Sequence, residues 1–340
     1  TDTTLLGGGA PGVDLMRLDI VWLPEFHSAG WLAPLSGDTL SIGEFLPALE
    51  QIDAYDGELY AVGWNIDAGL LYYRRDLLAA AGIENPPETW DELIDDISHV
   101  RGLPEAPPDG FLFQGRQYEG LSCVYLEQVV SRGGSLTPGE DLNRQAHLAA
   151  LRYLRRLVDE GLSPRDTPSR FDEERARERF QRGDAVFMRN WPYAWSMLNA
   201  ADSPVAGKVG IATLPHGPDG ESSGAMGGWH LAVPASSTRR EDAARLAAFL
   251  TSPDVQLELA RELNWLPTRL AAWDDPRLVQ LAPEVARLRE VAESAVPRPA
   301  LPDYPELSLE LQRQVNAVIA GLATPEEAWD RLRSRLEARE

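Results

Sequence analysis

Short apolar runs of strand length alternate with amphipathic helical stretches along most of this chain, and that alternation limits the folds open to it. Runs at 13–22, 57–73 and 185–188 have the composition of buried strands. Between them, the leucines at 148, 151, 154 and 157 recur at helical spacing, and the final third is mainly helical. This alternation predicts an α/β fold with largely parallel sheets. A chain of 340 residues is long enough for two compact domains.

The charge balance and the cysteine count exclude several functional classes. Asp and Glu number 53 against 32 Lys and Arg, so the formal net charge is −21 and the average surface repels nucleic acid. The single cysteine, Cys123, excludes an internal disulfide and a cysteine-based zinc site. The 5 histidines lack metalloprotease spacing, so we expect neither a metal site nor a cofactor. No apolar run approaches the ~20 residues of a membrane-spanning helix.

Three large rings follow the apolar run 185–188, where a strand is expected to give way to a helix. We expect Trp191 and Tyr193 to form a platform for the flat apolar face of a ligand, with core packing as the alternative. Trp195, four residues after Trp191, is expected to be a core ring. Two glycines before Trp229 allow close backbone approach and mark a second candidate ring. Such rings match the C–H faces of a pyranose, so these segments predict sugar binding.

Two carboxylates lie where predicted strands end. Asp19 lies near the end of the first run, and Asp67 lies in a polar break within 57–73 that we interpret as a crossing between domains. In open α/β sheets, ligands bind beyond the carboxyl ends of the strands, where Asp19, Asp67 and Trp191 would all lie. Carboxylates suit the hydroxyl edge of a sugar. The alternative for Asp19 is that it only caps a helix.

Several short segments are specific for one family through their order and spacing. They are Asp19-Ile20-Val21-Trp22, 29–35, 60–62, 70–77, Pro87-Glu88-Thr89-Trp90-Asp91-Glu92-Leu93, Gly183-Asp184-Ala185-Val186-Phe187-Met188 and 249–252. Over essentially the whole chain they resemble the extracellular solute-binding proteins of ABC importers, in the carbohydrate-binding group that includes maltose-binding protein. The segments most similar to the trehalose/maltose-binding branch are 114–121, 189–195, 227–229 and 298–299.

The resemblance implies a two-lobed, periplasmic-binding-protein-like α/β fold of type II that closes on its ligand at a hinged cleft. Lobe one is expected at 1–64 plus 228–274 and lobe two at 68–227 plus 275–340. The hinge crossings are then expected near 65–67, 226–229 and 274–276. The resemblance also implies a strand, a helix and a second strand before the region where this sequence opens, and these elements are expected to be missing from it.

The resemblance also implies roles for individual residues. Asp19 and Asp67 would accept hydrogen bonds from sugar hydroxyls, and Arg298 would donate to them, with a surface salt bridge as its alternative. Pyranose rings would stack on Trp191, Tyr193 and Trp229. Asn65 stands beside Asp67, where the branch often has an aromatic residue, and this departure is expected to alter selectivity. The second-tier candidates are Trp22, Trp64, Glu119 and Gly228.

The function implied by the resemblance is non-catalytic. The protein is expected to bind an α-glucoside disaccharide, trehalose or maltose, and to deliver it to the permease and ATPase of an ABC importer. It is expected to be a monomer outside the cytoplasm, either periplasmic or lipid-anchored, with membrane contact only through the anchor or permease. One alternative is a glycoside hydrolase that uses Asp19 and Asp67 as its two carboxyl groups. Another is a sugar-sensing module for a receptor or kinase.

Overall fold

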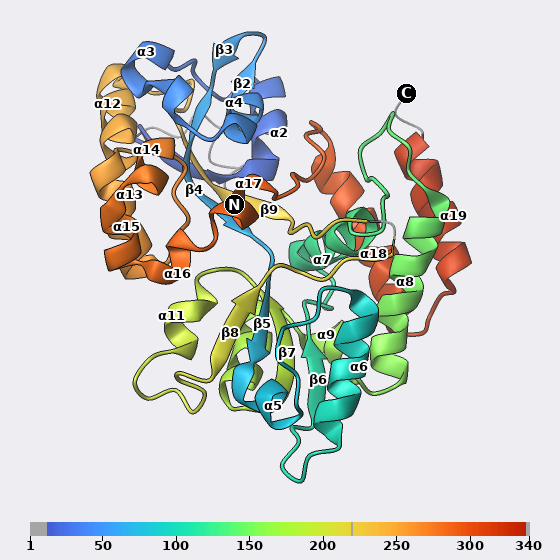
Figure 1. The fold of residues 1–340 in the computed structure, drawn as a ribbon. Helices are drawn as coiled ribbons and strands as arrows, with labels where there is room; N and C mark the ends of the chain where they lie inside the picture. Colours follow the sequence, from blue (N-terminus) through green and yellow to red (C-terminus); the bar gives the residue numbers. More distant parts are fainter. Residues whose placement is uncertain (1–11, 219, 338–340) are drawn as a thin grey trace. The chain divides into compact units, whose positions relative to one another are not determined.

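The protein divides into two compact units in the computed structural model, which describes residues 12–218 and 220–337 (Figure 1). The first unit contains the chain up to Ala68 together with Met226–Tyr304, and the second contains Gly69–Ala225 and the chain from Pro305 onward. The chain therefore crosses between the units at 68/69, 225/226 and 304/305.

The third crossing lies further along the chain than the sequence predicts. Residues 275–304, expected in the second lobe, belong to the first unit. Helix α17 (Arg289–Glu293) packs on strand β4 (Ala61–Ala68), and Met226 N–H donates to the carbonyl of Val296 at 2.7 Å. These contacts tie the segment to the sheet of the first unit.

The first unit has a three-stranded sheet in the order β1-β9-β4, with β1 at Met16–Asp19 and β9 at Met226–Ala232. Both strand pairs are antiparallel, so the expectation of largely parallel sheets is wrong here. Strand β4 carries the chain to the first crossing and β9 carries it back from the second. Neighbouring strands that leave and re-enter a unit in this way run in opposite directions.

Among the described residues of the first unit, the other regular elements are helices and one short hairpin, β2–β3. A core of apolar side chains that includes Phe45, Val62 and Leu231 packs the sheet against its helices. Figure 1 shows α12, α13 and α15 gathered along one side of this unit. The elements are η1 (Ile20–Trp22), α2 (Leu23–Ser28), α3 (Gly37–Leu40), η2 (Ile42–Glu44), α4 (Pro47–Asp53), β2 (Ala54–Tyr55), β3 (Glu58–Leu59), α12 (Arg240–Leu250), α13 (Pro253–Leu263), α14 (Leu270–Asp274), α15 (Pro276–Leu281), α16 (Pro283–Ala286) and α17.

The second unit has a four-stranded sheet in the order β6-β7-β5-β8. Its strands are β5 (Leu70–Arg74), β6 (Asp109–Leu112), β7 (Ala185–Asn190) and β8 (Val209–Ala212). Only β6 and β7 pair in parallel among the described strands of this sheet. Strand β5 leads away from the first crossing and β7 returns toward it, so Asn190 at the end of β7 pairs with Leu70. The residues that follow β7 are thereby held close to the crossing.

Helices cover the sheet of the second unit, and several begin where capping predicts. Helix α6 starts after Thr89, whose side chain and that of Glu92 form both hydrogen bonds of a capping box. Helices α8 and α19 lie side by side (Figure 1). The helices are α5 (Arg75–Ala80), α6 (Trp90–Arg101), α7 (Glu119–Val130), α8 (Arg144–Asp159), α9 (Thr167–Arg170), α10 (Glu173–Gln181), α11 (Ala194–Leu198), α18 (Tyr304–Ile319, starting at the third crossing) and α19 (Pro325–Glu337).

Candidate functional site

Strand register gathers four of the predicted site residues on one face of the first unit's sheet. Trp229 on the central strand β9 pairs with Asp19 of β1 on one side and with Asn65 of β4 on the other. Asp67 lies two residues beyond Asn65 on the same strand, and alternate residues of a strand share a face. Asn65 and Asp67 lie inside β4. The crossing between units that was expected near 65–67 therefore occurs at 68/69.

Gly228 allows β9 to approach β4 closely beside Trp229. Its φ of +136° is one that other residues rarely adopt. A Cβ placed there would lie 2.4 Å from the backbone oxygen of Asn65. Gly228 therefore supports the site through backbone packing, and any larger residue would separate Trp229 from β4.

Asp19 and Arg298 form an ion pair although they are far apart in sequence. The Nη2 of Arg298 donates to Asp19 Oδ1 at 2.9 Å, and Arg298 is 6% exposed. The same Oδ1 accepts the backbone N–H of Val21 at 3.1 Å and caps η1. Asp19 therefore caps η1, as its alternative predicts, but its ion pair with Arg298 is largely buried and is not a surface salt bridge; these contacts fix the carboxylate and guanidinium side by side. Such a pair can accept and donate hydrogen bonds to neighbouring hydroxyls.

Asn65 and Asp67 form a second polar pair on the same face. Asn65 Nδ2 donates to Asp67 Oδ2 at 3.2 Å. Asn65 is only 1% exposed, and its Oδ1 has no hydrogen-bond partner among the described residues. A buried acceptor without a partner is costly, so this oxygen is suited to a donor that arrives with water or a ligand.

Trp229 is partly buried beneath a cation that the sequence analysis does not identify. The guanidinium carbon of Arg17 lies 3.7 Å from the centroid of the Trp229 ring, which covers one face of the indole. Arg17 is two residues before Asp19 on β1, so strand alternation puts it on the same face. This two-residue spacing from Asp19 could have marked Arg17 as a candidate site residue in the sequence.

Trp191 in the second unit is held at its backbone, its edge and one face. Its carbonyl accepts the Tyr72 hydroxyl at 2.7 Å, and its Nε1 donates to Glu173 Oε1 at 3.3 Å. The guanidinium carbon of Arg189 lies 3.9 Å from its ring centroid. With its polar edge satisfied, the group that Trp191 can offer a ligand is the second face of its ring.

Two tyrosines near Trp191 are likewise held by glutamates of α10. The hydroxyl of Tyr193 donates to Glu174 Oε1 at 2.6 Å, and that of Tyr118 donates to Glu173 Oε2 at 2.6 Å. Burial first, and then these carboxylates, raise the pKa of both phenols. The phenol protons are therefore retained, and the rings have fixed orientations.

Trp195 does not have the core position expected for it. It lies on α11, whose buried residues are Ala194 and Leu198, and its own side chain is partly exposed. Trp191 precedes this short helix, so the two rings do not occupy the same helical face as their spacing suggests.

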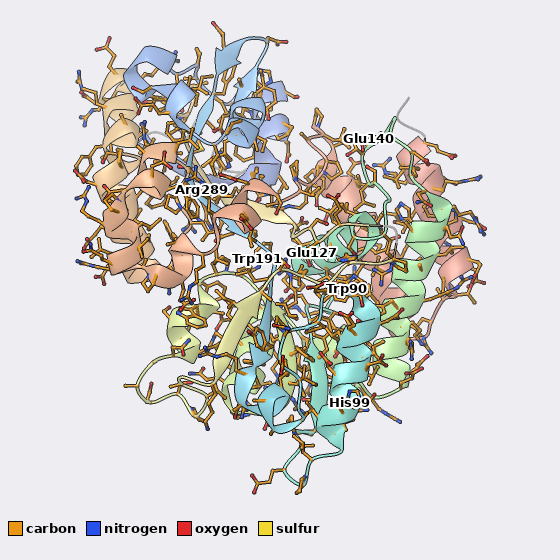
Figure 2. The ribbon with its side chains drawn as sticks, viewed as in Figure 1. Trp90, His99, Glu127, Glu140, Trp191 and Arg289 are labelled. Carbon is orange, nitrogen blue, oxygen red and sulfur yellow. The ribbon has the colours of Figure 1, made fainter. Side chains whose placement is uncertain are left out.

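A buried ion pair that was not predicted from the sequence lies behind Trp191. Arg189 Nη2 and Glu127 Oε1 are 2.5 Å apart, and both side chains are 2% exposed. Burial opposes the charge on Arg189, but the charge and hydrogen bonds of Glu127 outweigh burial and raise the arginine pKa. Figure 2 labels Glu127 and Trp191 in the same part of this unit. The sequence signal was Glu127 itself, a charged residue within a largely apolar stretch of helix α7.

The remaining second-tier residues make contacts within the protein. Trp22 stacks on Phe26 with centroids 6.1 Å apart, and Trp64 packs against Trp265 and the apolar core of the first unit. In the second unit, Glu119 accepts a hydrogen bond from Ser308 of α18. These contacts do not join Trp22 or Trp64 to the Asp19–Trp229–Asn65 row.

Residues 12–218 and 220–337 contain no cluster of three or more His, Cys, Asp and Glu side chains arranged to hold a metal ion. Within the same ranges, no helix has both the length and the apolar character needed to cross a membrane.

Comparison with known proteins identifies the family. The model of the family described as bacterial extracellular solute-binding protein matches residues 2–287. A probable ABC transporter-binding protein of Deinococcus radiodurans is 34% identical, over 97% of this chain and 81% of its own length.

Solved structures with the same fold include maltose-bound MalE3 of T. maritima, at 38% identity and a TM-score of 0.91, covering 98% of this chain and 86% of that one. A solute-binding protein from Thermotoga lettingae bound with α-D-tagatose has 28% identity and a TM-score of 0.84, covering 99% of this chain and 87% of that one.

These relatives are two-lobed, non-catalytic binding proteins, so the hydrolase hypothesis for Asp19 and Asp67 is wrong. The family model and the relative agree over most of the chain. The chain belongs to the bacterial extracellular solute-binding protein family.

Proposed function

We propose that this protein binds an α-linked glucose disaccharide, trehalose or maltose, outside the cytoplasm and delivers it to the permease and ATPase of an ABC importer. The observation that carries the proposal is the row of Asp19, Trp229 and Asn65 across one sheet face, with Arg298 paired to Asp19. Carboxylate, guanidinium and amide groups around an indole match both the hydroxyl edge and the C–H face of a pyranose.

The two units are proposed to contribute different parts of the recognition. In the first unit, Asp19, Asn65, Asp67 and Arg298 would exchange hydrogen bonds with hydroxyls while Trp229 contacts a ring. In the second unit, Trp191 and Tyr193 would supply the stacking surface, with Glu119 as a further acceptor. We propose that both sets bind the same sugar, and that the units act as lobes whose three crossings form the hinge.

The comparisons support a sugar ligand and leave its size to experiment. The T. maritima protein binds the disaccharide maltose, and the T. lettingae protein binds a monosaccharide. The α-glucoside disaccharide is favoured for this chain because candidate rings occur in both units, which suits a ligand with more than one pyranose face. The family description and the Deinococcus relative support an extracytoplasmic location and an ABC transporter partner.

Isothermal titration calorimetry of the purified protein tests the proposal. The titrants are trehalose, maltose, sucrose and maltotriose, with tagatose, mannitol and ribitol as smaller alternatives. We expect saturable heat and one site per monomer for trehalose or maltose, and binding at least about tenfold weaker for the smaller compounds. Tight binding of a monosaccharide or polyol in place of a disaccharide would correct the ligand class. Absence of heat with every sugar would contradict the proposed function.

A further inference from the structure

The Glu127–Arg189 pair is a fixed structural element inside the second unit. Arg189 Nε lies 3.0 Å from Glu127 Oε2, and Arg189 Nη2 also contacts the glutamate, so the pair is bidentate. Gln114 adds a further hydrogen bond by donating from Nε2 to the Arg189 carbonyl at 3.1 Å. A planar guanidinium held by two parallel bonds has little freedom to rotate.

On one side, this pair supports the proposed stacking ring. Arg189 presents its guanidinium to one face of Trp191 at 3.9 Å from the ring centroid. The indole edge is held by Glu173, so two contacts from different elements fix the plane of the ring. A ring fixed before binding loses less conformational entropy when a sugar stacks on it.

On the other side, the same glutamate holds the chain at two crossings between the units. Ala225 is the last residue before the second crossing, and its backbone N–H donates to Glu127 Oε1 at 3.0 Å. Gly69, the first residue after the first crossing, donates its N–H to the Ala225 carbonyl at 3.3 Å. The two crossing segments are therefore bonded to each other and to Glu127.

Glycine is needed where these segments meet the ion pair. A Cβ on Gly69 would lie 2.0 Å from Glu127 Oε1 and 2.8 Å from Arg189 Nη2. A Cβ on Gly224 would lie 2.5 Å from the carbonyl oxygen of Gly69. A side chain at Gly69 would therefore displace the ion pair, and one at Gly224 would displace the backbone of Gly69.

We propose that Glu127 and Arg189 are positioning residues that set the indole plane of Trp191 relative to the crossing segments at 69 and 224–225. This inference rests on the proposed function, because it assigns the pair a role in sugar binding. Its consequence is that a small change at a crossing alters sugar affinity through Trp191.

The choice of an ion pair fits a positioning role better than a purely stabilising one. Buried ion pairs are often no more stabilising than apolar side chains of the same volume. What an arginine fork adds is a defined plane and direction, which a lysine or an apolar side chain does not provide. Arg189→Lys should therefore keep the buried charge and lose the alignment of the indole.

Fluorine NMR of the ligand-free protein, labelled with 5-fluorotryptophan, tests the positioning directly. The Trp191 signal is assigned with Trp191→Phe, and Trp229 in the first unit is the internal reference. Gly69→Ala and Arg189→Lys are expected to shift or broaden the Trp191 signal and leave Trp229 unchanged. Gly43→Ala is the matched control, because a Cβ on Gly43 meets nothing within 4 Å. An unchanged Trp191 signal in a folded Arg189→Lys protein would overturn the inference, even if Gly69→Ala does not fold.

A double-mutant cycle on sugar affinity tests the route through Trp191. Arg189→Lys is expected to weaken binding about tenfold in the wild-type background and less than about twofold in the Trp191→Ala background. Equal losses in both backgrounds would show that the pair acts elsewhere and would overturn the inference. If the wild-type protein binds no sugar, the proposed function fails, while the NMR measurement still decides whether the pair positions the ring.

Discussion

The two units hold their candidate ligand-binding groups in opposite ways. In the first unit, Asn65 is paired with Asp67 and Arg298 with Asp19, and Asn65 Oδ1 remains a buried acceptor without a partner among the described residues. In the second unit, the polar edges of Trp191 and Tyr193 are already bonded to glutamates of α10. The first set can still exchange hydrogen bonds, whereas the second offers mainly ring faces.

This difference suggests that the two units contribute differently to binding. Hydrogen bonds have direction, so a polar set discriminates between stereoisomers whose hydroxyls point differently. Stacking depends on contact area and is tolerant of hydroxyl orientation. We therefore expect the first unit to determine which sugar is bound and the second to determine how tightly sugars in general are bound.

The largest expected effect concerns stability, because the second unit contains a buried neutral histidine. His147 contacts the Tyr125 hydroxyl through Nδ1 at 2.7 Å and the Ser135 carbonyl through Nε2 at 3.0 Å, and burial lowers its pKa to about 4. The unfolded chain binds this proton near pH 6.5, so it holds more protons than the folded state between these values. The free energy of unfolding should fall by up to about 3 kcal/mol as the pH drops from 6.5 to 4.

Urea unfolding at several pH values measures this contribution. The His147→Gln variant should lose the corresponding part of the pH dependence, whereas replacement of the exposed His99 by Gln should not. Equal slopes for the wild-type and His147→Gln proteins would show that the buried histidine does not govern acid stability.

The next largest effect is expected at the stacking ring. Trp191→Ala should lower the affinity for every bound sugar by roughly 100-fold, because central aromatic contacts carry much of the binding energy of an interface. The ratio of affinities between stereoisomeric disaccharides should change little. Calorimetry on Trp195→Ala, which removes the partly exposed ring of α11, serves as the control and should show wild-type affinity. A strong change in preference among stereoisomeric disaccharides for Trp191→Ala would contradict the proposed difference between the units.

Asp67→Asn should have a smaller effect on affinity and a larger effect on selectivity. Loss of a charged acceptor is expected to lower the affinity for the preferred sugar by roughly tenfold to thirtyfold, which is within the range for hydrogen bonds to charged groups. The affinities of stereoisomeric sugars should change by different factors. Asp56→Asn is the control, because Asp56 is exposed in a turn with φ of +52°, which asparagine tolerates. A uniform loss across all sugars would assign Asp67 to general affinity.

The smallest effect is expected for Arg17→Gln. Arg17 covers one face of Trp229 but is itself exposed, so its stacking is worth little. We expect a change of about threefold or less in affinity, measured by calorimetry against Arg245→Gln at an exposed position of α12. A loss comparable to that of Trp191→Ala would mean that Arg17 contacts the sugar directly.

Much of the fold follows from local sequence signals, because helix caps and apolar periodicity are local. The capping box at Thr89 and the leucine spacing of α8 both predict helices that the structure contains. The prediction of largely parallel strands was wrong, because strand direction depends on where the chain leaves and re-enters a unit. The predicted position of the third crossing was also wrong, because the packing of α17 on β4 is a tertiary contact that no local sequence signal marks.

The candidate site was predictable where residue type and strand position coincide. Asp19 and Trp229 could be selected individually, but their pairing across β1 and β9 depends on register. The Arg189–Glu127 pair was not predicted, because its partners lie on β7 and α7 and no sequence spacing joins them. The residues proposed to bind a ligand could therefore be selected from the sequence, whereas the residues that hold them in place could not.

Hydrogen–deuterium exchange with and without saturating sugar tests the proposal that both sets of residues bind one ligand. We expect slowed exchange in peptides that cover 64–68 and 226–230 of the first unit and also in peptides that cover 189–195 of the second. Peptides from the hairpin β2–β3 should exchange at the same rate in both states. Protection confined to one unit, or no protection with any sugar that binds, would contradict it.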